Sequence, residues 1–274
     1  MESEYWRFRL VRLRNLTRRL QEPDDVSMQN SNHGSVEDLQ NVSALVLAGG
    51  KGRRLRPFTA NFPKPLMPIG DRTILEVILE RLSEHGVERV TLAVNHLAPL
   101  IRAYFTDCTR VSLDLDYIYE DRPLGTAGPI GGLAEVSGTL LVMNGDILTD
   151  LDFRRMVAEH RRKGAALSVA TMLRRFEIDS GVVDANDQGQ VVGFREKPVA
   201  HHRICIGIYA LEARARALIR PNVPLDMPDL IMQLVEAGET VAVYDHDGKW
   251  IDIGRPDDLA EAQRLYELRP AETI

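Results

Sequence analysis

VSALVLAGGKGRRLRP, residues 42–57, joins an apolar run to a loop rich in glycine and arginine. The run 42–48 has the length of a buried strand, and the glycines after it allow a tight turn. Backbone N–H groups exposed in such a loop can bind phosphate oxygens, and Arg53, Arg54 and Arg56 add positive charge. The loop lacks both the Gly-Lys-Ser/Thr of a Walker loop and the third glycine of a dinucleotide fingerprint. It therefore indicates a phosphate site of another kind at the end of a strand, with an ordinary glycine-rich turn as the alternative.

Segments of strand and helix character alternate beyond this loop. Strands are expected at 87–94, 113–119, 139–143, 165–172, 204–210, 240–244 and 249–251, and helices at 73–85, 99–105, 153–163, 211–219, 226–237 and 256–268. Such alternation is typical of a three-layer, Rossmann-like α/β fold with a mainly parallel central sheet. A turn between two valine-rich segments within 181–194 predicts a small antiparallel excursion in the second half.

The first 41 residues differ in charge from the rest of the chain. Residues 1–20 contain six arginines and two glutamates, whereas residues 21–41 contain five acids and no lysine or arginine. Apolar side chains at helical spacing, beginning with Trp6, predict an amphipathic helix over 5–20, followed by a polar linker. The helix is interpreted either as a packing or dimer element or as a membrane-surface or basic tail. We therefore expect two parts, a basic helix with its linker over 1–41 and a catalytic domain over 42–270.

Composition and charge exclude several classes of protein. Hydrophobic residues make up 44% and charged residues 27% of the 274, which excludes wholesale disorder. The net charge of −6 argues against a nucleic-acid partner, and no apolar run reaches the length of a membrane helix. Cys108 and Cys205 are too few and too far apart for a disulfide framework. With no signal peptide, these features favour a cytoplasmic protein.

A lysine between two prolines follows the glycine-rich loop. Lys64 lies in FPKPLMPI, residues 62–69, where the prolines hold the backbone extended. A stiff segment can position an ammonium group over a phosphate with little further loss of entropy. Taken alone, the segment is more typical of a solvated lysine in a proline-rich loop.

The motifs together resemble those of the sugar-1-phosphate nucleotidylyltransferases, also called nucleotide-sugar pyrophosphorylases. The matching segments are AGGKGRRLRP (48–57), FPKPLMP (62–68), LGTAG (124–128), NGD (144–146), FREKP (194–198), GIY (207–209) and WIDIGRP (250–256). They occur in the family's order and cover about residues 42–268. The LGTAG loop is most similar to that of mannose- and heptose-1-phosphate guanylyltransferases.

The resemblance implies a role for each matching residue. It implies catalytic roles for Arg54, Lys64 and Lys197, and Mg²⁺ as the cofactor, held by Asp146 and Asp252. Nucleotide binding is implied for Leu47, Gly49, Gly50, Gly52, Arg53, Gly125, Thr126 and Gly128, and sugar-phosphate binding for Gly145, Glu196, Lys197 and Gly207. Arg53 stands where the family usually has threonine, so the phosphate contacts of this loop differ from the usual pattern.

The implied reaction joins a nucleoside triphosphate, with GTP favoured, to a sugar or sugar-like 1-phosphate and releases pyrophosphate. The expected partners are these two substrates and further copies of the chain, with the N-terminal helix as one surface for self-association. Thymidylyl and uridylyl enzymes of the family carry similar loops, and a non-catalytic, sugar-nucleotide-binding regulatory subunit is a further alternative. A choline- or isoprenoid-type cytidylyltransferase fits FREKP and WIDIGRP poorly, and the missing third glycine disfavours a Rossmann oxidoreductase.

Overall fold

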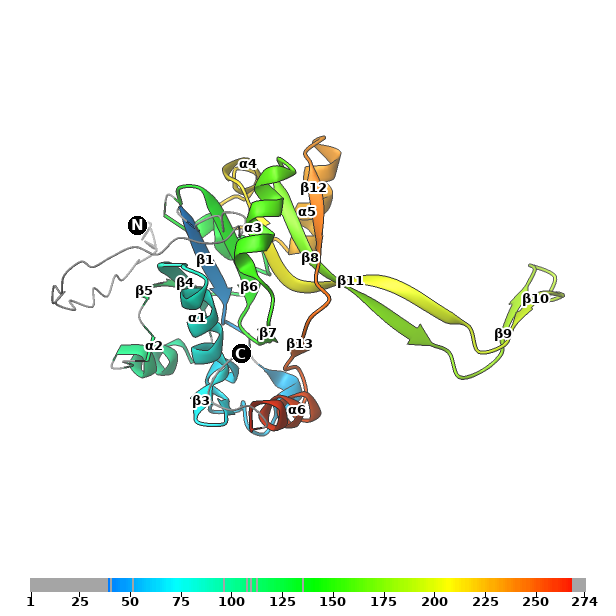
Figure 1. Cartoon of the computed structure of the whole chain (residues 1–274), viewed down its shortest axis with the longest axis horizontal. Helices are drawn as coiled ribbons and strands as arrows, with labels where there is room; N and C mark the ends of the chain where they lie inside the picture. Colours follow the sequence, from blue (N-terminus) through cyan, green and yellow to red (C-terminus); the bar gives the residue numbers. More distant parts are fainter. Residues whose placement is uncertain are drawn as a thin grey trace, which may run out of the picture.

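A seven-stranded sheet forms the centre of the molecule (Figure 1). The computed structural model describes residues 39–267 except residues 40, 51, 96, 107, 109, 112 and 135. The strand order is β12-β8-β11-β6-β1-β4-β5. The strands are β1 (Val42–Leu47), β4 (Arg89–Val94), β5 (Asp114–Tyr119), β6 (Thr139–Asn144), β8 (Leu167–Glu177), β11 (Val199–Leu211) and β12 (Val241–Asp245). Only β11 runs antiparallel to its neighbours, β6 and β8. The predicted mainly parallel sheet is therefore confirmed.

Helices cover both faces of the sheet, as a three-layer fold requires. One core contains buried side chains of α1 (Ile74–Glu84), α2 (Ala98–Thr106), α3 (Phe153–Arg162) and α6 (Pro256–Glu267). The other core contains side chains of the short helix η3 (Gly128–Gly132), of α4 (Ala213–Arg216) and of α5 (Met227–Glu236). Successive strand residues alternate between the cores, as with Leu45 in one and Val46 in the other. Among the described helices none is long and apolar enough to cross a membrane.

Short elements join the sheet to the loops at its edge. They are the 3₁₀ helices η1 (Arg53–Leu55) and η2 (Lys64–Leu66), the strand pair β2 (Pro68–Ile69) with β3 (Arg72–Thr73), and the strand pair β7 (Ile147–Thr149) with β13 (Trp250–Asp252). β13 agrees with the expected strand 249–251, but β7 had no counterpart in the sequence analysis. A three-residue strand gives no periodic signal, so its pairing appears only in the folded chain.

The expected helix 211–219 is wrong in its extent. β11 continues to Leu211, which is fully buried and pairs with Leu140 and Leu167 of the neighbouring strands. The helix α4 then holds only four residues, Ala213–Arg216. The two cross-strand neighbours stabilise Leu211 in the sheet, overriding the helical spacing of the sequence. The expected helix 5–20 lies outside the described residues.

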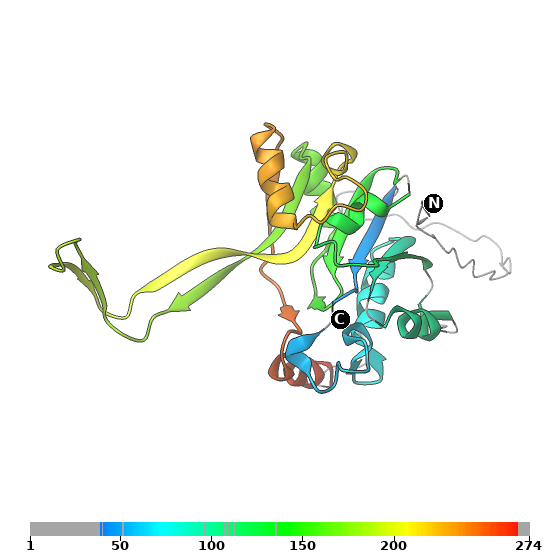
Figure 2. The same cartoon turned by 180° about the vertical axis from the view of Figure 1, so that it is seen from behind.

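The antiparallel excursion is larger than the sequence predicts. β8 and β11 run together beyond the sheet and end in the hairpin of β9 (Val182–Ala185) and β10 (Val191–Arg195). Both views show these strands leaving the body as a long arm with the hairpin at its far end (Figures 1 and 2). Residues 173–203 are called the arm below.

A buried polar cluster joins α3 to the edge where β6 and β8 begin. His160 is fully buried, its Nδ1 lies 2.8 Å from Ser168 Oγ, and its Nε2 lies 3.1 Å from Glu212 Oε1. Burial is the main cause that lowers the pKa of His160, and Glu212 opposes it only in part. The folded state therefore favours the neutral ring.

Replacing His160 by glutamine is expected to remove a pH-dependent part of the stability. Since the folded pKa is lowered, the unfolded chain takes up the proton first as the pH falls below about 6.5. Because of His160, the unfolding free energy of the wild type falls by at most about 1.4 kcal/mol for each unit by which the pH is lowered. Urea unfolding should show a less stable variant at about pH 7.5 and a smaller gap at about pH 5.5. His201→Gln, at an exposed histidine, is the control, and a pH-independent gap would contradict the prediction.

Candidate active site

The candidate site lies at the edge where β1 and β6 end. The N–H of Gly145, in the turn after β6, donates to the carbonyl of Leu47 at the end of β1 (2.9 Å). A Cβ on Gly145 would lie only 2.8 Å from that carbonyl oxygen, so the close approach of the two segments requires glycine. The turn before Asp146 and the glycine-rich loop are thus adjacent. Carboxyl ends of parallel strands are the usual place for ligands in such sheets.

The glycine-rich loop turns sharply at Gly52. This residue has a φ of 55°, in the left-handed region, and precedes η1. Its carbonyl accepts a hydrogen bond from Thr59 Oγ1 (2.6 Å). Leu55 of η1 is fully buried, whereas Gly50, Arg53 and Arg54 are exposed. The buried leucine anchors the loop and leaves its glycine backbone and arginines accessible.

Lys64 and two carboxylates meet beside this loop. The Lys64 ammonium, largely buried at the start of η2, donates to Asp146 Oδ2. Asp252 pairs with Ile147 across β7 and β13, and the N–H of Ile253 donates to the carbonyl of Asp146 (2.9 Å). Burial, and then the nearby charge of Asp146, raise the pKa of Asp252, while Lys64 opposes the shift. The two carboxylates are therefore close enough to repel one another.

Arg54 completes this charged group. A Cβ on Gly254 would lie 3.1 to 3.2 Å from the guanidinium atoms of Arg54, so the guanidinium packs on the backbone just after Asp252. Arg54 also lowers the pKa of Asp252, against the larger effects of burial and Asp146. Residues separated by almost 200 positions thus form one cluster of Arg54, Lys64, Asp146 and Asp252, called the charged cluster below.

Hydrogen bonds connect the loop 124–128 to the residues at the start of α5. The N–H groups of Ala127 and Gly128 both donate to the carbonyl of Leu225 (2.9 and 3.0 Å). The N–H of Thr126 donates to Asp226 Oδ1 (3.0 Å), and its hydroxyl accepts from the N–H of Met227 (2.8 Å). The Thr126 side chain is thus occupied within the protein, and Gly128 is buried. Of the three predicted contact residues in this loop, Gly125 is the exposed one.

Glu120 links the two loops. It follows β5, and its Oε2 accepts from the N–H of Leu124 (3.0 Å). A Cβ on Gly49 would lie 3.3 Å from its Oε1, so the carboxylate borders the glycine-rich loop. Burial raises the pKa of Glu120, with the hydrogen bond from Leu124 opposing. Sequence reasoning missed Glu120, Asp226 and the contact made by Gly254, because each depends on packing between distant loops.

The remaining predicted residues fall into two groups. Gly207 is buried beside the turn after β6, where a Cβ would lie 2.6 Å from Ile147 Cδ1 and 2.7 Å from Asn144 Nδ2. Glu196 and Lys197 lie instead in the arm, beyond β10 and far from β7 and β13 (Figure 1). The structure therefore groups Arg54, Lys64, Asp146 and Asp252 at one edge of the sheet, and Glu120 joins the loop 124–128 to the glycine-rich loop. Glu196 and Lys197 of the same chain lie apart from them.

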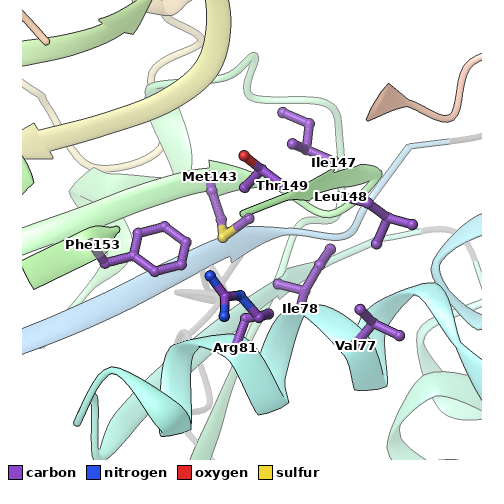
Figure 3. Close-up of a pocket in the computed structure, with 8 residues that line it drawn as sticks. All are labelled: Val77, Ile78, Arg81, Met143, Ile147, Leu148, Thr149 and Phe153. Atoms are coloured by element: carbon purple, nitrogen blue, oxygen red, sulfur yellow. The ribbon is translucent and has the colours of Figure 1, made fainter. Parts of the chain in front are cut away.

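A small pocket near this edge is too small for a substrate. It measures about 10 Å³ and lies between α1, the β6–β7 segment and the first residue of α3. Figure 3 shows its mainly apolar lining, with Arg81 of α1 extending toward Met143 and Phe153. That volume is about the size of a single water. Substrates of the predicted size therefore need the open edge of the sheet.

The donor set of the charged cluster fits Mg²⁺. Mg²⁺ usually takes one or two carboxylates, keeps several waters and uses substrate phosphates as further ligands. Asp146 and Asp252 are two neighbouring carboxylates whose repulsion a cation would relieve. No group of three or more His, Cys, Asp or Glu side chains suited to a metal occurs in the described part of the chain. The pair thus fits a site completed by water and phosphate.

Comparisons with known proteins agree with this geometry. Residues 43–269 match the family described as Nucleotidyl transferase. The chain is 34% identical over 243 residues to a UTP–glucose-1-phosphate uridylyltransferase of Synechocystis, covering 81% of this chain and 63% of that protein. It is 30% identical over 227 residues to a mannose-1-phosphate guanylyltransferase of Mycobacterium tuberculosis, covering 80% and 62%. The chain thus spans a little under two thirds of these relatives.

Solved structures share the fold. HddC of Yersinia pseudotuberculosis, in a structure with GMP-PN, has a TM-score of 0.64 and 24% identity, covering 82% of this chain and 99% of that one. A putative glucose-1-phosphate thymidylyltransferase of Bacillus anthracis has a TM-score of 0.67 and 20% identity, covering 85% and 98%. Family match, relatives and site geometry lead to one conclusion: the chain belongs to the nucleotidyl transferase family.

Proposed function

We propose that the chain transfers a nucleoside monophosphate from a nucleoside triphosphate to a sugar 1-phosphate, or a sugar-like 1-phosphate, and releases pyrophosphate. One observation carries the proposal. The charged cluster places two cations and two carboxylates beside a phosphate-compatible loop at the carboxyl edge of the sheet. Two polyanionic substrates must approach each other for this reaction, and neutralising their charge is the main task of such a site.

The family resemblance and the position of each group support the following roles. An oxygen of the sugar phosphate attacks the α-phosphorus, and the bond from that phosphorus to the pyrophosphate oxygen breaks. Arg54, exposed in the glycine-rich loop, binds the triphosphate, and Lys64 holds its ammonium between Asp146 and the incoming phosphate. Mg²⁺, held by Asp146 and Asp252, would supply positive charge to the phosphate oxygens when bound. Gly145 and Gly207 allow the turn after β6 to pack closely against Leu47 and against β11, which supports placing the sugar phosphate beside this turn.

GTP is the proposed nucleotide, with UTP or dTTP as the alternative. The Glu120 carboxylate borders both the glycine-rich loop and the loop 124–128. Guanine carries two neighbouring donors, N1–H and N2–H, which match the two oxygens of a carboxylate. Uracil and thymine carry one N–H between two carbonyls. Their carbonyl oxygens are repelled by the oxygens of a carboxylate. A hydrogen-bonding site can discriminate strongly on this basis.

Pyrophosphate release tests the reaction and the base together. The wild type is assayed with GTP, UTP, dTTP, ATP and CTP against a panel of sugar 1-phosphates, including mannose and glucose 1-phosphate. We expect pyrophosphate release with one combination of nucleotide and sugar 1-phosphate, in which GTP is the nucleotide. No release with any pair would overturn the transfer and leave a regulatory, sugar-nucleotide-binding role. Release with UTP alone would keep the transfer and overturn the assignment of guanine.

Replacing Glu120 by glutamine is expected to reduce the preference for GTP. Glutamine keeps an oxygen for the N–H of Leu124 but presents an N–H where guanine requires an acceptor. Loss of a charged hydrogen bond of about 1.5 to 3 kcal/mol lowers the GTP-to-UTP ratio of kcat/KM by about 10- to 100-fold. Asp121→Asn, at the neighbouring exposed carboxylate, is the matched control. An unchanged ratio in the Glu120 variant would contradict base recognition at this position.

A further inference from the structure

The arm exposes apolar side chains that the molecule itself does not cover. Two strands without a third strand or a helix form at best a marginally stable unit in water. Eight large apolar side chains are at least 42% exposed there: Leu173, Phe176, Ile178, Val183, Val191, Val192, Phe194 and Val199. An apolar surface of this extent, on strands with open edges, is typical of a binding surface.

The arm leaves the body at the edge that carries the candidate site. At its base, Arg203 makes two hydrogen bonds to the carboxylate of Asp245 on β12 (2.7 and 2.9 Å). The pairing of β8 with β11 then continues from Thr171–Cys205 to Glu177–Val199 with its only register shift between Cys205 and Tyr209, inside the body. This continuous ladder carries the hairpin away from the charged cluster of its own chain (Figures 1 and 2).

The outer part of the arm carries two charged residues suited to a sugar phosphate, a lysine for the phosphate and a glutamate for a sugar hydroxyl. Glu196 and Lys197 are exposed and lie between β10 and β11. Lys197 has a φ of 41°, which is unusual for a residue other than glycine and is often found at functional sites. Glu196 Oε2 would lie 3.3 Å from a Cβ on Gly181, so the carboxylate stays within the hairpin. No described contact uses the Lys197 ammonium inside the arm.

The body has a receiving surface beside the charged cluster. Phe58 and Phe62 lie between the glycine-rich loop and Lys64, and their side chains are 57% and 41% exposed. The arm contains five cations and five anions, so it has no net charge that would oppose its approach to a chain of net charge −6. These are Arg174, Arg175, Arg195, Lys197 and Arg203, with Glu177, Asp179, Asp184, Asp187 and Glu196. One chain thus holds both an apolar arm and an apolar, phosphate-binding edge.

We propose that two copies of the chain exchange arms, and that Glu196 and Lys197 of each copy complete the sugar-phosphate site of the other, with Lys197 on the phosphate and Glu196 on a sugar hydroxyl. The proposal rests on the proposed function for the chemistry of that site. A twofold pair satisfies both observations at once, because each arm is covered and each edge receives a lysine. Exchange of an identical element between copies needs no new fold and is a common route to dimers.

Complementation between two inactive variants tests the exchange. Lys197→Ala and Asp146→Asn carry different affinity tags, are co-expressed, and the doubly tagged dimer is isolated. In that dimer one site combines an unchanged body with an unchanged arm, so we expect about half of the wild-type turnover, although each variant alone is nearly inactive. A mixed dimer with no more activity than its parents would overturn the exchange. A wild type that releases no pyrophosphate would overturn the proposed function instead.

Sedimentation tests the exchange without any assay of activity. The wild type should have twice the mass of the 30.8 kDa chain. Leu173→Asp with Val192→Asp, at exposed positions of the arm, should give the monomer, whereas Met232→Asp, 54% exposed on α5, should remain dimeric. A monomeric wild type, with the arm free or folded onto its own body, would overturn the proposal. So would a dimer that the two arm changes leave intact.

Discussion

Replacing Asp146 by asparagine should lower kcat for pyrophosphate release by about 1,000-fold or more while leaving the fold intact. Asparagine has nearly the same shape and still accepts the hydrogen bond from Lys64. What disappears is one negative charge of the pair that is proposed to hold Mg²⁺. The substitution weakens the ion pair with Lys64 but also ends the repulsion between Asp146 and Asp252, so the two effects on the unfolding free energy oppose each other and the fold should be kept.

The reciprocal change and the double variant make this prediction sharper. Asp252→Asn should cause a similar loss, and the double variant should be about as slow as either single variant, because groups that act as one unit are not additive. Mn²⁺ binding, followed by electron paramagnetic resonance, should weaken in all three. Asp247→Asn, an exposed carboxylate between β12 and β13, is the control and should behave as wild type. Near-native turnover of both single variants would show that the pair does not hold the metal.

The central sheet was predictable because its strands are buried on both faces. Such strands are continuous apolar runs, and the helices between them show a clear apolar stripe, as in α1 and α3. The length of the arm was not predictable in the same way. Beyond Met172 the strand β8 continues as Leu173, Arg174, Arg175, Phe176 and Glu177, where exposed charged and apolar residues alternate irregularly. With no buried face to fix a period, the sequence shows a loop as readily as a strand.

The residues of the charged cluster could be predicted from the sequence, but the contacts between them could not. Asp146 follows a strand of the parallel sheet, and strand ends of this kind share one edge. The position of Asp252 depends on the pairing of two three-residue strands, β7 and β13, which leave almost no trace in the sequence. Lys64, the first residue of η2, contacts Asp146 across 82 residues of sequence. Such contacts depend on tertiary packing rather than on any local pattern.

Glu120 and Asp226 had weak signals that became meaningful only in the structure. Glu120 directly follows a buried strand, and Asp226 occupies the position before a helix that begins with Met227 and Pro228. An aspartate there normally caps its own helix. Here its side chain accepts instead from the N–H of Thr126, 100 residues away. A local rule therefore identified the helix start but not the partner.

Replacing Gly125 by alanine is expected to raise the KM for the nucleoside triphosphate by about 10- to 100-fold, with a smaller effect on kcat. Gly125 has a φ of 77°, and alanine in the left-handed region costs about 1 kcal/mol. A Cβ would also lie 2.5 Å from the carbonyl oxygen of Leu225 and 2.6 Å from Asp226 Oδ1. The carbonyl is backbone and cannot swing away, so the loop 124–128 must move as a whole. Its movement breaks the hydrogen bonds that Leu225 accepts from Ala127 and Gly128.

Gly164→Ala is the control that separates two effects of Gly125→Ala: the steric clash of the new Cβ and the cost of a left-handed backbone conformation. Gly164 also has a positive φ, 56°, but a Cβ there would meet no atom within 4 Å. The control should lose about 1 kcal/mol of unfolding free energy and keep its KM. Steady-state kinetics and urea unfolding of the two variants then give a direct contrast. An unchanged KM in the Gly125 variant, despite reduced stability, would show that the nucleotide does not rest on this loop, because a displaced loop cannot keep its contacts with a bound ligand.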